Sequence, residues 1–193
     1  MKKILPFKKN GGFTLLEISV AISIFVLSII LASSLYIIAQ RLYNQSSGRA
    51  ELSQNARVIL DRISRELRQA AAITTSLPPT NTDPINPPAE EIFFQDGHNY
   101  NQITYIRYYL NGANLARRHK AYYFNNEPDT YVAWNSVDKN GDAPAEKILS
   151  ESVVGEYFNS LTFWGSGGKI NITANLNKNQ NNLKIETSVY KRN

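Results

Sequence analysis

The residues with the clearest capacity for chemistry lie near the N-terminus, where a glycine pair precedes an aromatic residue and a carboxylate follows. They are Gly11, Gly12, Phe13 and Glu17. Two successive glycines favour an accessible, extended backbone, so the basic segment before them looks like a removable leader. Glu17 needs its own explanation, because a carboxylate costs about 3 kcal/mol when a helix carries it to the centre of a bilayer.

A purely structural role for Glu17 is also available. Thr14 and Glu17 have the spacing of a capping box, in which both side chains bind free amides of the first helical turn. If the bond before Phe13 is cut, the Glu17 carboxylate of one subunit could instead neutralise the new Phe13 amine of a neighbour. Two such charges about 4 Å apart attract by roughly 4 kcal/mol at an effective dielectric constant of about 20, before desolvation is subtracted. The two roles are compatible.

A long apolar run follows this motif. Residues 18–39 hold 17 apolar side chains and five serines without one charge. They make a helix of about 33 Å, against about 30 Å of bilayer hydrocarbon. A secretory signal peptide would have an apolar region of about 7–15 residues and then a small-x-small cleavage site, which is not evident near Ala39. A plain signal anchor would explain the helix but not the glycine pair with Glu17.

Charge and cysteine content narrow the class of protein. The 193-residue chain has a formal net charge of +5, and the four lysines before Gly11 contribute most of it. The rest of the chain therefore gives no indication of nucleic-acid binding, and the lysine cluster favours a cytoplasmic leader. Cysteine is absent, which excludes disulfides, cysteine nucleophiles and thiolate metal sites.

In its order of basic leader, glycine pair, Phe13, Glu17 and apolar helix, the chain resembles the type IV prepilin superfamily. The resemblance implies that prepilin peptidase cuts between Gly12 and Phe13 and methylates the new Phe13 amine. It also implies that Phe13 and Glu17 act in assembly with other pilin or pseudopilin subunits. Looser matches, at residues 57–70 and 103–118, are to the minor pilins and pseudopilins of the PilW and GspJ group.

The order of elements predicts an α+β fold, in which a long N-terminal helix packs on a C-terminal, antiparallel β-rich head. Nothing strongly breaks a helix from Phe13 to about Ala72. An apolar stripe marks its second half, at Leu52, Ala56, Ile59, Ile63, Leu67 and Ala70. The predicted segments are a leader (1–12), a transmembrane and assembly helix (13–39), an amphipathic helix (40–73), a Pro-rich loop (74–90) and a β-rich globular head (91–193).

Strands are predicted where the apolar period changes from 3.6 to 2. Alternation over residues 169–176 and 183–189 predicts a hairpin with an Asn-rich turn at 177–182. Residues 103–110 run into Asn111-Gly112, a hairpin-type dipeptide. Further aromatic-rich strands are expected at 91–95, 131–134 and 157–164.

Enzymatic and metal sites find little support in the sequence. His98 and His119 are the only histidines, and with no serine motif or carboxylate pair beside them they are expected to face solvent. Residues 165–169 lack the Ser or Thr that a phosphate loop needs after its lysine, so they predict a flexible turn. An EF-hand loop that starts at Asp138 would need glycine at its sixth position and glutamate at its twelfth, where Ala143 and Leu149 stand, so residues 138–142 predict an Asx turn. The arginines of residues 57–68 alternate with acidic side chains and indicate a solvated, ion-paired face.

The resemblance therefore implies a structural subunit, a minor pilin or pseudopilin, of a type IV pilus or type II secretion-type filament. It would be stored as a single-pass protein of the inner membrane, with the leader cytoplasmic and the head extracytoplasmic. No catalytic residue, metal site, cofactor or nucleic-acid partner is expected. The alternative is a membrane-tethered extracellular binding module that does not polymerise, and fold alone does not decide between the two.

Overall fold

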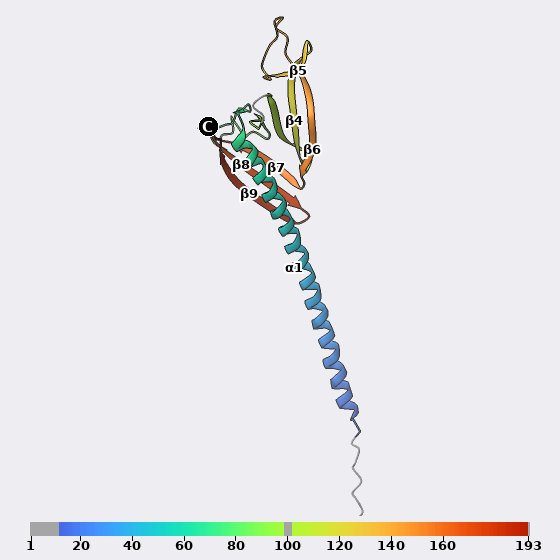
Figure 1. Ribbon diagram of the computed structural model, residues 1–193. Helices are drawn as coiled ribbons and strands as arrows, with labels where there is room; N and C mark the ends of the chain where they lie inside the picture. The colour runs from blue at the N-terminus through green and yellow to red at the C-terminus, as the bar shows by residue number, and fades with distance from the viewer. Residues whose placement is uncertain (1–11, 99–101, 193) are drawn as a thin grey trace, which may run out of the picture. The chain divides into compact units, whose positions relative to one another are not determined.

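The computed structural model describes residues 12–98 and 102–192, which contain one helix and nine strands. Contacts between residues divide the chain into two units, Met1–Ser46 and Ser47–Asn193. The helix, α1 (Leu15–Gln69), contributes residues to both units (Figure 1). A long apolar N-terminal helix followed by antiparallel sheets confirms the predicted α+β class. Of the predicted leader, only Gly12 falls within the described residues.

The second unit, called the head from here on, contains two antiparallel sheets. In the first sheet the strand order is β1-β2-β3-β4-β5, and β6 pairs with β4 on the edge opposite to β3. The second sheet has the order β7-β8-β9. The strands are β1 (Ala72–Ile73), β2 (Ile92–Gln95), β3 (Thr104–Asn111), β4 (Asn114–Phe124), β5 (Glu127–Val132), β6 (Ala145–Gly155), β7 (Phe158–Trp164), β8 (Lys169–Lys178) and β9 (Asn181–Tyr190).

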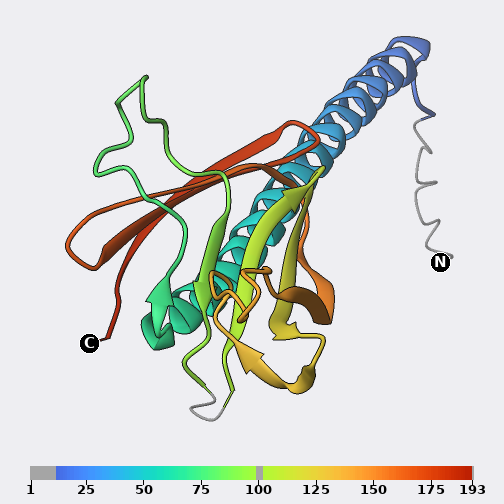
Figure 2. The same ribbon diagram turned by 90° about the horizontal axis from the view of Figure 1, so that it is seen from above.

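The last part of α1 packs against both sheets and joins them through one core. All six residues of the predicted apolar stripe, from Leu52 to Ala70, are buried. They form one cluster with side chains of the first sheet, such as Phe94 and Tyr108, and of the second, such as Phe163 and Ile172. Figure 2 shows both sheets lying against the last turns of α1. The stripe therefore covers the apolar faces of the two sheets, which is why neither sheet needs a second layer of helices.

The helix ends earlier than the sequence predicted. It was expected to continue to residue 73, but it ends at Gln69, and Ala72–Ile73 is strand β1. The Ala71 amide donates to the Gln95 carbonyl at 3.0 Å, and Ala72 pairs with Gln95 in the ladder with β2. Pairing with a neighbouring strand thus outweighs the high helix propensity of alanine.

The Pro-rich loop at 74–90 forms no helix or long strand, as predicted, but it is anchored to the second sheet. Ala89 and Phe163 exchange two backbone hydrogen bonds of 2.9 and 2.8 Å. The Gly165 amide also donates to the Pro78 carbonyl at 2.8 Å. The loop therefore covers an edge of β7 that would otherwise present unpaired backbone groups.

The predicted hairpin of the last two strands is present as β8–β9, and the hairpin-type dipeptide Asn111-Gly112 lies at the β3–β4 turn. Asn111 and Asn114 close the β3–β4 turn, where Gly112 has a positive φ of 61°. The β8–β9 turn is tighter than the predicted 177–182, because the ladder continues to the pair Lys178 and Asn181 and leaves two residues between the strands. The strand expected at 131–134 is shifted towards the N-terminus as β5, and β4 and β6 were not predicted as strands.

We expect Ile63→Ala to cost about 2–4 kcal/mol of head stability. Ile63 is fully buried between helix and sheets, so the truncation removes packed methyl groups and leaves a cavity. Val58→Ala is the matched control, because Val58 lies on the same helix with 64% of its surface exposed. Urea unfolding of a fragment that begins at residue 41 measures both losses, and equal losses would contradict the assigned buried face.

Candidate assembly site

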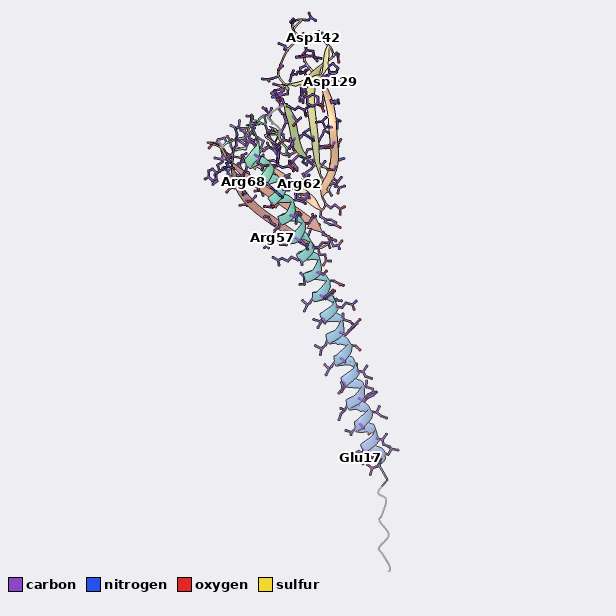
Figure 3. All side chains as sticks on the ribbon, in the orientation of Figure 1. Glu17, Arg57, Arg62, Arg68, Asp129 and Asp142 are labelled. Carbon is purple, nitrogen blue, oxygen red and sulfur yellow. The ribbon has the colours of Figure 1, made fainter. Side chains whose placement is uncertain are left out.

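The helix begins directly after a threonine that caps it. The Glu17 amide donates to Thr14 Oγ1 at 3.3 Å, and the Ile18 amide donates to the Thr14 carbonyl at 3.2 Å. This is one half of the predicted capping box. Among the hydrogen bonds formed by residues 12–98 and 102–192, none involves the Glu17 carboxylate, which is exposed at the start of α1 (Figure 3). The cap therefore engages the Glu17 backbone, and its carboxylate has no hydrogen-bond partner among the described residues.

Gly12 and Phe13, the two residues at the predicted cleavage point, are exposed, as Glu17 is. Phe13 is 80% exposed, and a β-carbon placed on Gly12 would meet no atom within 4 Å. The absence of a side chain at Gly12 is therefore not required by the packing of the described chain. Gly12 and Phe13 directly precede α1, and Glu17 lies in its first turn.

The helix surface that follows is apolar on every side and buried nowhere within the chain. Every residue from 12 to 46 is exposed, with Phe25 and Leu31 each 65% exposed. The most apolar 18-residue stretch of α1 has a mean hydropathy of 2.6, so the helix contains a segment long and apolar enough to cross a membrane. Apolar patches of this extent are not stable against water and mark a membrane or protein contact. The segment is consistent with a single-pass membrane anchor.

Four of the five serines of this segment have their hydroxyl donors satisfied within the helix. Ser19, Ser23, Ser28 and Ser34 each donate to a backbone carbonyl three or four residues earlier, at 2.8–2.9 Å. These bonds satisfy the hydroxyl groups inside the helix, and the small side chains leave room for another helix to approach closely. Hydrogen bonding of the serines between helices stays a prediction.

In the head, an ion-pair network lies where the sequence indicated a solvated face. Glu66 faces the sheet, and both its carboxylate oxygens accept from Arg117 Nε at 3.1 Å. Tyr108 Oη donates to the same carboxylate at 2.8 Å. The Glu66 and Arg117 side chains are only 13% and 15% exposed. The sequence did contain a signal that Glu66 is buried. Glu66 follows Ile63 by three residues and precedes Ala70 by four, which places it in the apolar stripe.

The network shifts the ionisation of its members. Burial, and then the charge and hydrogen bond of Glu66, raise the pKa of Tyr108. Burial lowers the pKa of the Arg117 guanidinium, but the hydrogen bond and charge of Glu66 more than offset this, and the net pKa is raised. Tyr108 therefore remains a neutral donor and Arg117 a cation at any physiological pH. Elsewhere on this helix face, the ion pair between Arg65 and Asp61 at 3.5 Å is exposed, as expected of a solvated face.

The two segments that resemble a calcium loop and a phosphate loop in the sequence are turns in the structure. Asp138 Oδ1 accepts from the amides of Asn140 and Asp142, both at 2.8 Å, which is the predicted Asx turn. Gly165, Gly167 and Gly168 all have positive φ angles, as the predicted turn before β8 requires. No group of three His, Cys, Asp or Glu side chains suited to a metal occurs in the part of the chain that the structure describes.

The two histidines differ from each other. The His98 side chain is 52% exposed, in keeping with the prediction, and its Nδ1 lies 2.6 Å from Asp96 Oδ1. The His119 side chain is 26% exposed and points to the helix side of the first sheet, so the expected solvent-facing position is wrong for it. Burial and the nearby Arg117 charge lower the pKa of His119. It is therefore a neutral structural side chain near pH 7.

Comparison of the chain with protein-family models, with characterised proteins and with solved structures finds no match.

Proposed function

We propose that this chain is a structural subunit of a type IV pilus or type II secretion-type filament, made as a precursor and processed by prepilin peptidase. Peptidase cleavage between Gly12 and Phe13 releases residues 1–12, and the new Phe13 amine is methylated. The mature subunit is stored as a single-pass protein of the inner membrane, with its head extracytoplasmic, and it then enters the filament through α1. Within the filament, the apolar helices of neighbouring subunits take the place of lipid.

One observation carries this proposal: an unburied, membrane-length apolar helix begins with an exposed carboxylate that no residue of 12–98 or 102–192 binds. Lipid alone gives no reason for Glu17, since a carboxylate near an apolar segment is unfavourable unless it has a partner. Thr14 already caps the first turn, so helix stability gives little reason for it either. A neighbouring Phe13 ammonium, created by cleavage, supplies the missing partner and would fix the axial register between subunits.

Processing is tested by the mass of the membrane-extracted protein. We expect the wild-type chain to begin at methylated Phe13 and the Gly12→Val variant to retain residues 1–12. A β-branched side chain at Gly12 crowds the approach of a protease to the scissile bond, whereas the chain itself has room for it. Ala21→Val, which adds a β-branched side chain at an exposed position of the helix, should be processed normally. A wild-type terminus at Met1 or near Gln40 would contradict the proposal.

A further inference from the structure

A cavity of about 760 Å³ lies in the head, at the end of α1. It is lined by the end of the helix, by Gly97 and His98 after β2, and by the two residues that follow β9. Its lining residues are Arg68, Gln69, Ala70, Ala71, Gly97, His98, Lys191 and Arg192. Two segments distant in sequence, the end of α1 and the residues after β9, thus supply three cationic side chains to one space.

Backbone hydrogen bonds fix the positions of these segments. The Arg192 amide donates to the Arg68 carbonyl at 3.1 Å, and the Lys191 amide donates to the Gly168 carbonyl at 3.0 Å. Gly97 is packed so closely that a β-carbon there would come within 1.9 Å of the Gln69 carbonyl oxygen. The backbone around the cavity is therefore preorganised, which reduces the entropy lost when a ligand binds.

The charge in the cavity has no counterpart in the described part of the head. Within residues 12–98 and 102–192, no acidic side chain lines the cavity, and no ion pair involves Arg68, Lys191 or Arg192. The Asp96 carboxylate does not line the cavity but contacts Nδ1 of His98, which does. The helix end contributes about −0.5 charge, which offsets only part of the three cations and leaves about +2.5.

We propose that this cavity binds a phosphate group, carried by a small phosphorylated molecule or by a lipid headgroup. Two guanidinium groups suit phosphate because each can donate two parallel hydrogen bonds to its oxygens, and an ammonium adds a point charge. A phosphate monoester carries about −1.5 to −2 charge near pH 7 and neutralises most of the excess, whereas a carboxylate carries −1. The volume exceeds that of the phosphate group itself, so part of the attached molecule also fits.

Calorimetric titration of the full chain in a non-ionic detergent tests the proposal, with inorganic phosphate as the probe in a phosphate-free buffer. We expect saturable binding that weakens about tenfold or more in Arg192→Gln, since a charge-assisted hydrogen bond contributes about 1.5–3 kcal/mol. Arg192 lies beyond the last strand, so this substitution leaves the sheets intact. Arg57→Gln removes the same charge from an exposed position outside the cavity and should bind like wild type. The affinity for a phosphate monoester should also fall below about pH 6, where the monoester loses its second charge.

Two further probes distinguish the sources of the phosphate. Glycerol 3-phosphate represents a soluble monoester, and glycerophosphoglycerol represents the diester of a lipid headgroup. Tighter binding of the monoester favours a small phosphorylated molecule, and tighter binding of the diester favours a lipid. Absence of saturable binding of all three probes, or an equal loss in Arg57→Gln and Arg192→Gln, would overturn the proposal. The filament function does not depend on either result, because the cavity lies entirely within the head.

Discussion

Replacing Glu66 by alanine is expected to destabilise the head by about 3–5 kcal/mol. The substitution leaves the Arg117 guanidinium, 15% exposed, without the carboxylate that accepts from its Nε. It also removes the acceptor of the Tyr108 hydroxyl, which is fully buried. Removing one partner of a buried ion pair costs this much because the other charge remains desolvated and unpaired. Guanidinium unfolding of a fragment that begins at residue 41 measures the loss.

Asp61→Ala is the matched control for this experiment. Asp61 is also an acidic residue of α1 with an arginine four positions away, but its side chain is 74% exposed. An exposed pair of this kind contributes less than about 1 kcal/mol. The double replacement Glu66→Leu with Arg117→Met should recover much of the stability, because an apolar pair of similar volume removes the buried charge altogether. Similar losses for Glu66→Ala and Asp61→Ala would show that the buried network contributes no more than a surface pair.

The same network explains why β4 could not be predicted from the sequence. A half-buried strand is recognised by alternation of apolar and polar residues, but Arg117 and His119 lie on the inner side of β4, between the apolar Leu115 and Ala121. The outer side carries Arg118 and Lys120, so both faces read as polar. The inward charge is tolerated only because Glu66 on the distant helix meets it, and this is a tertiary contact that no local pattern contains.

The second strand that the sequence did not predict, β6, was missed for a different reason. It is an edge strand that pairs only with β4, and eight of its residues, 146–153, are exposed one after another. Because neither face of β6 is buried along most of its length, apolar and polar residues need not alternate along it. By contrast β8, where buried and less buried residues alternate over much of the strand, was predicted almost to its ends. Sequence patterns thus found the strands with a recognisable apolar face. They missed β4, whose inner face carries a charge, and β6, which is held by pairing alone.

The last prediction concerns Glu17 and separates a filament subunit from a membrane-tethered binding module. If Glu17 supports only its own helix, Glu17→Gln should be nearly silent. The structure already assigns the cap to the Thr14 hydroxyl, which accepts from the backbone amide of residue 17 whatever the side chain is. Glutamine keeps the size of glutamate and serves equally in a capping box.

If Glu17 instead meets the Phe13 ammonium of a neighbouring subunit, the same change leaves a buried cation without its partner. The loss is then about 3–5 kcal/mol per contact, enough to exclude the variant from a filament while leader removal and membrane insertion continue. The measurement compares processed protein in the membrane with protein in sheared filaments, for wild type, Glu17→Gln and, as the control for the cap, Thr14→Ala. Incorporation lost in Glu17→Gln but kept in Thr14→Ala assigns the effect to charge, because the threonine variant weakens the helix start without touching the carboxylate. Unchanged incorporation of Glu17→Gln would refute the charge pair, and wild-type protein that never enters filaments under assembly-inducing conditions would favour the tethered module, in which the exposed apolar surface of α1 meets only lipid.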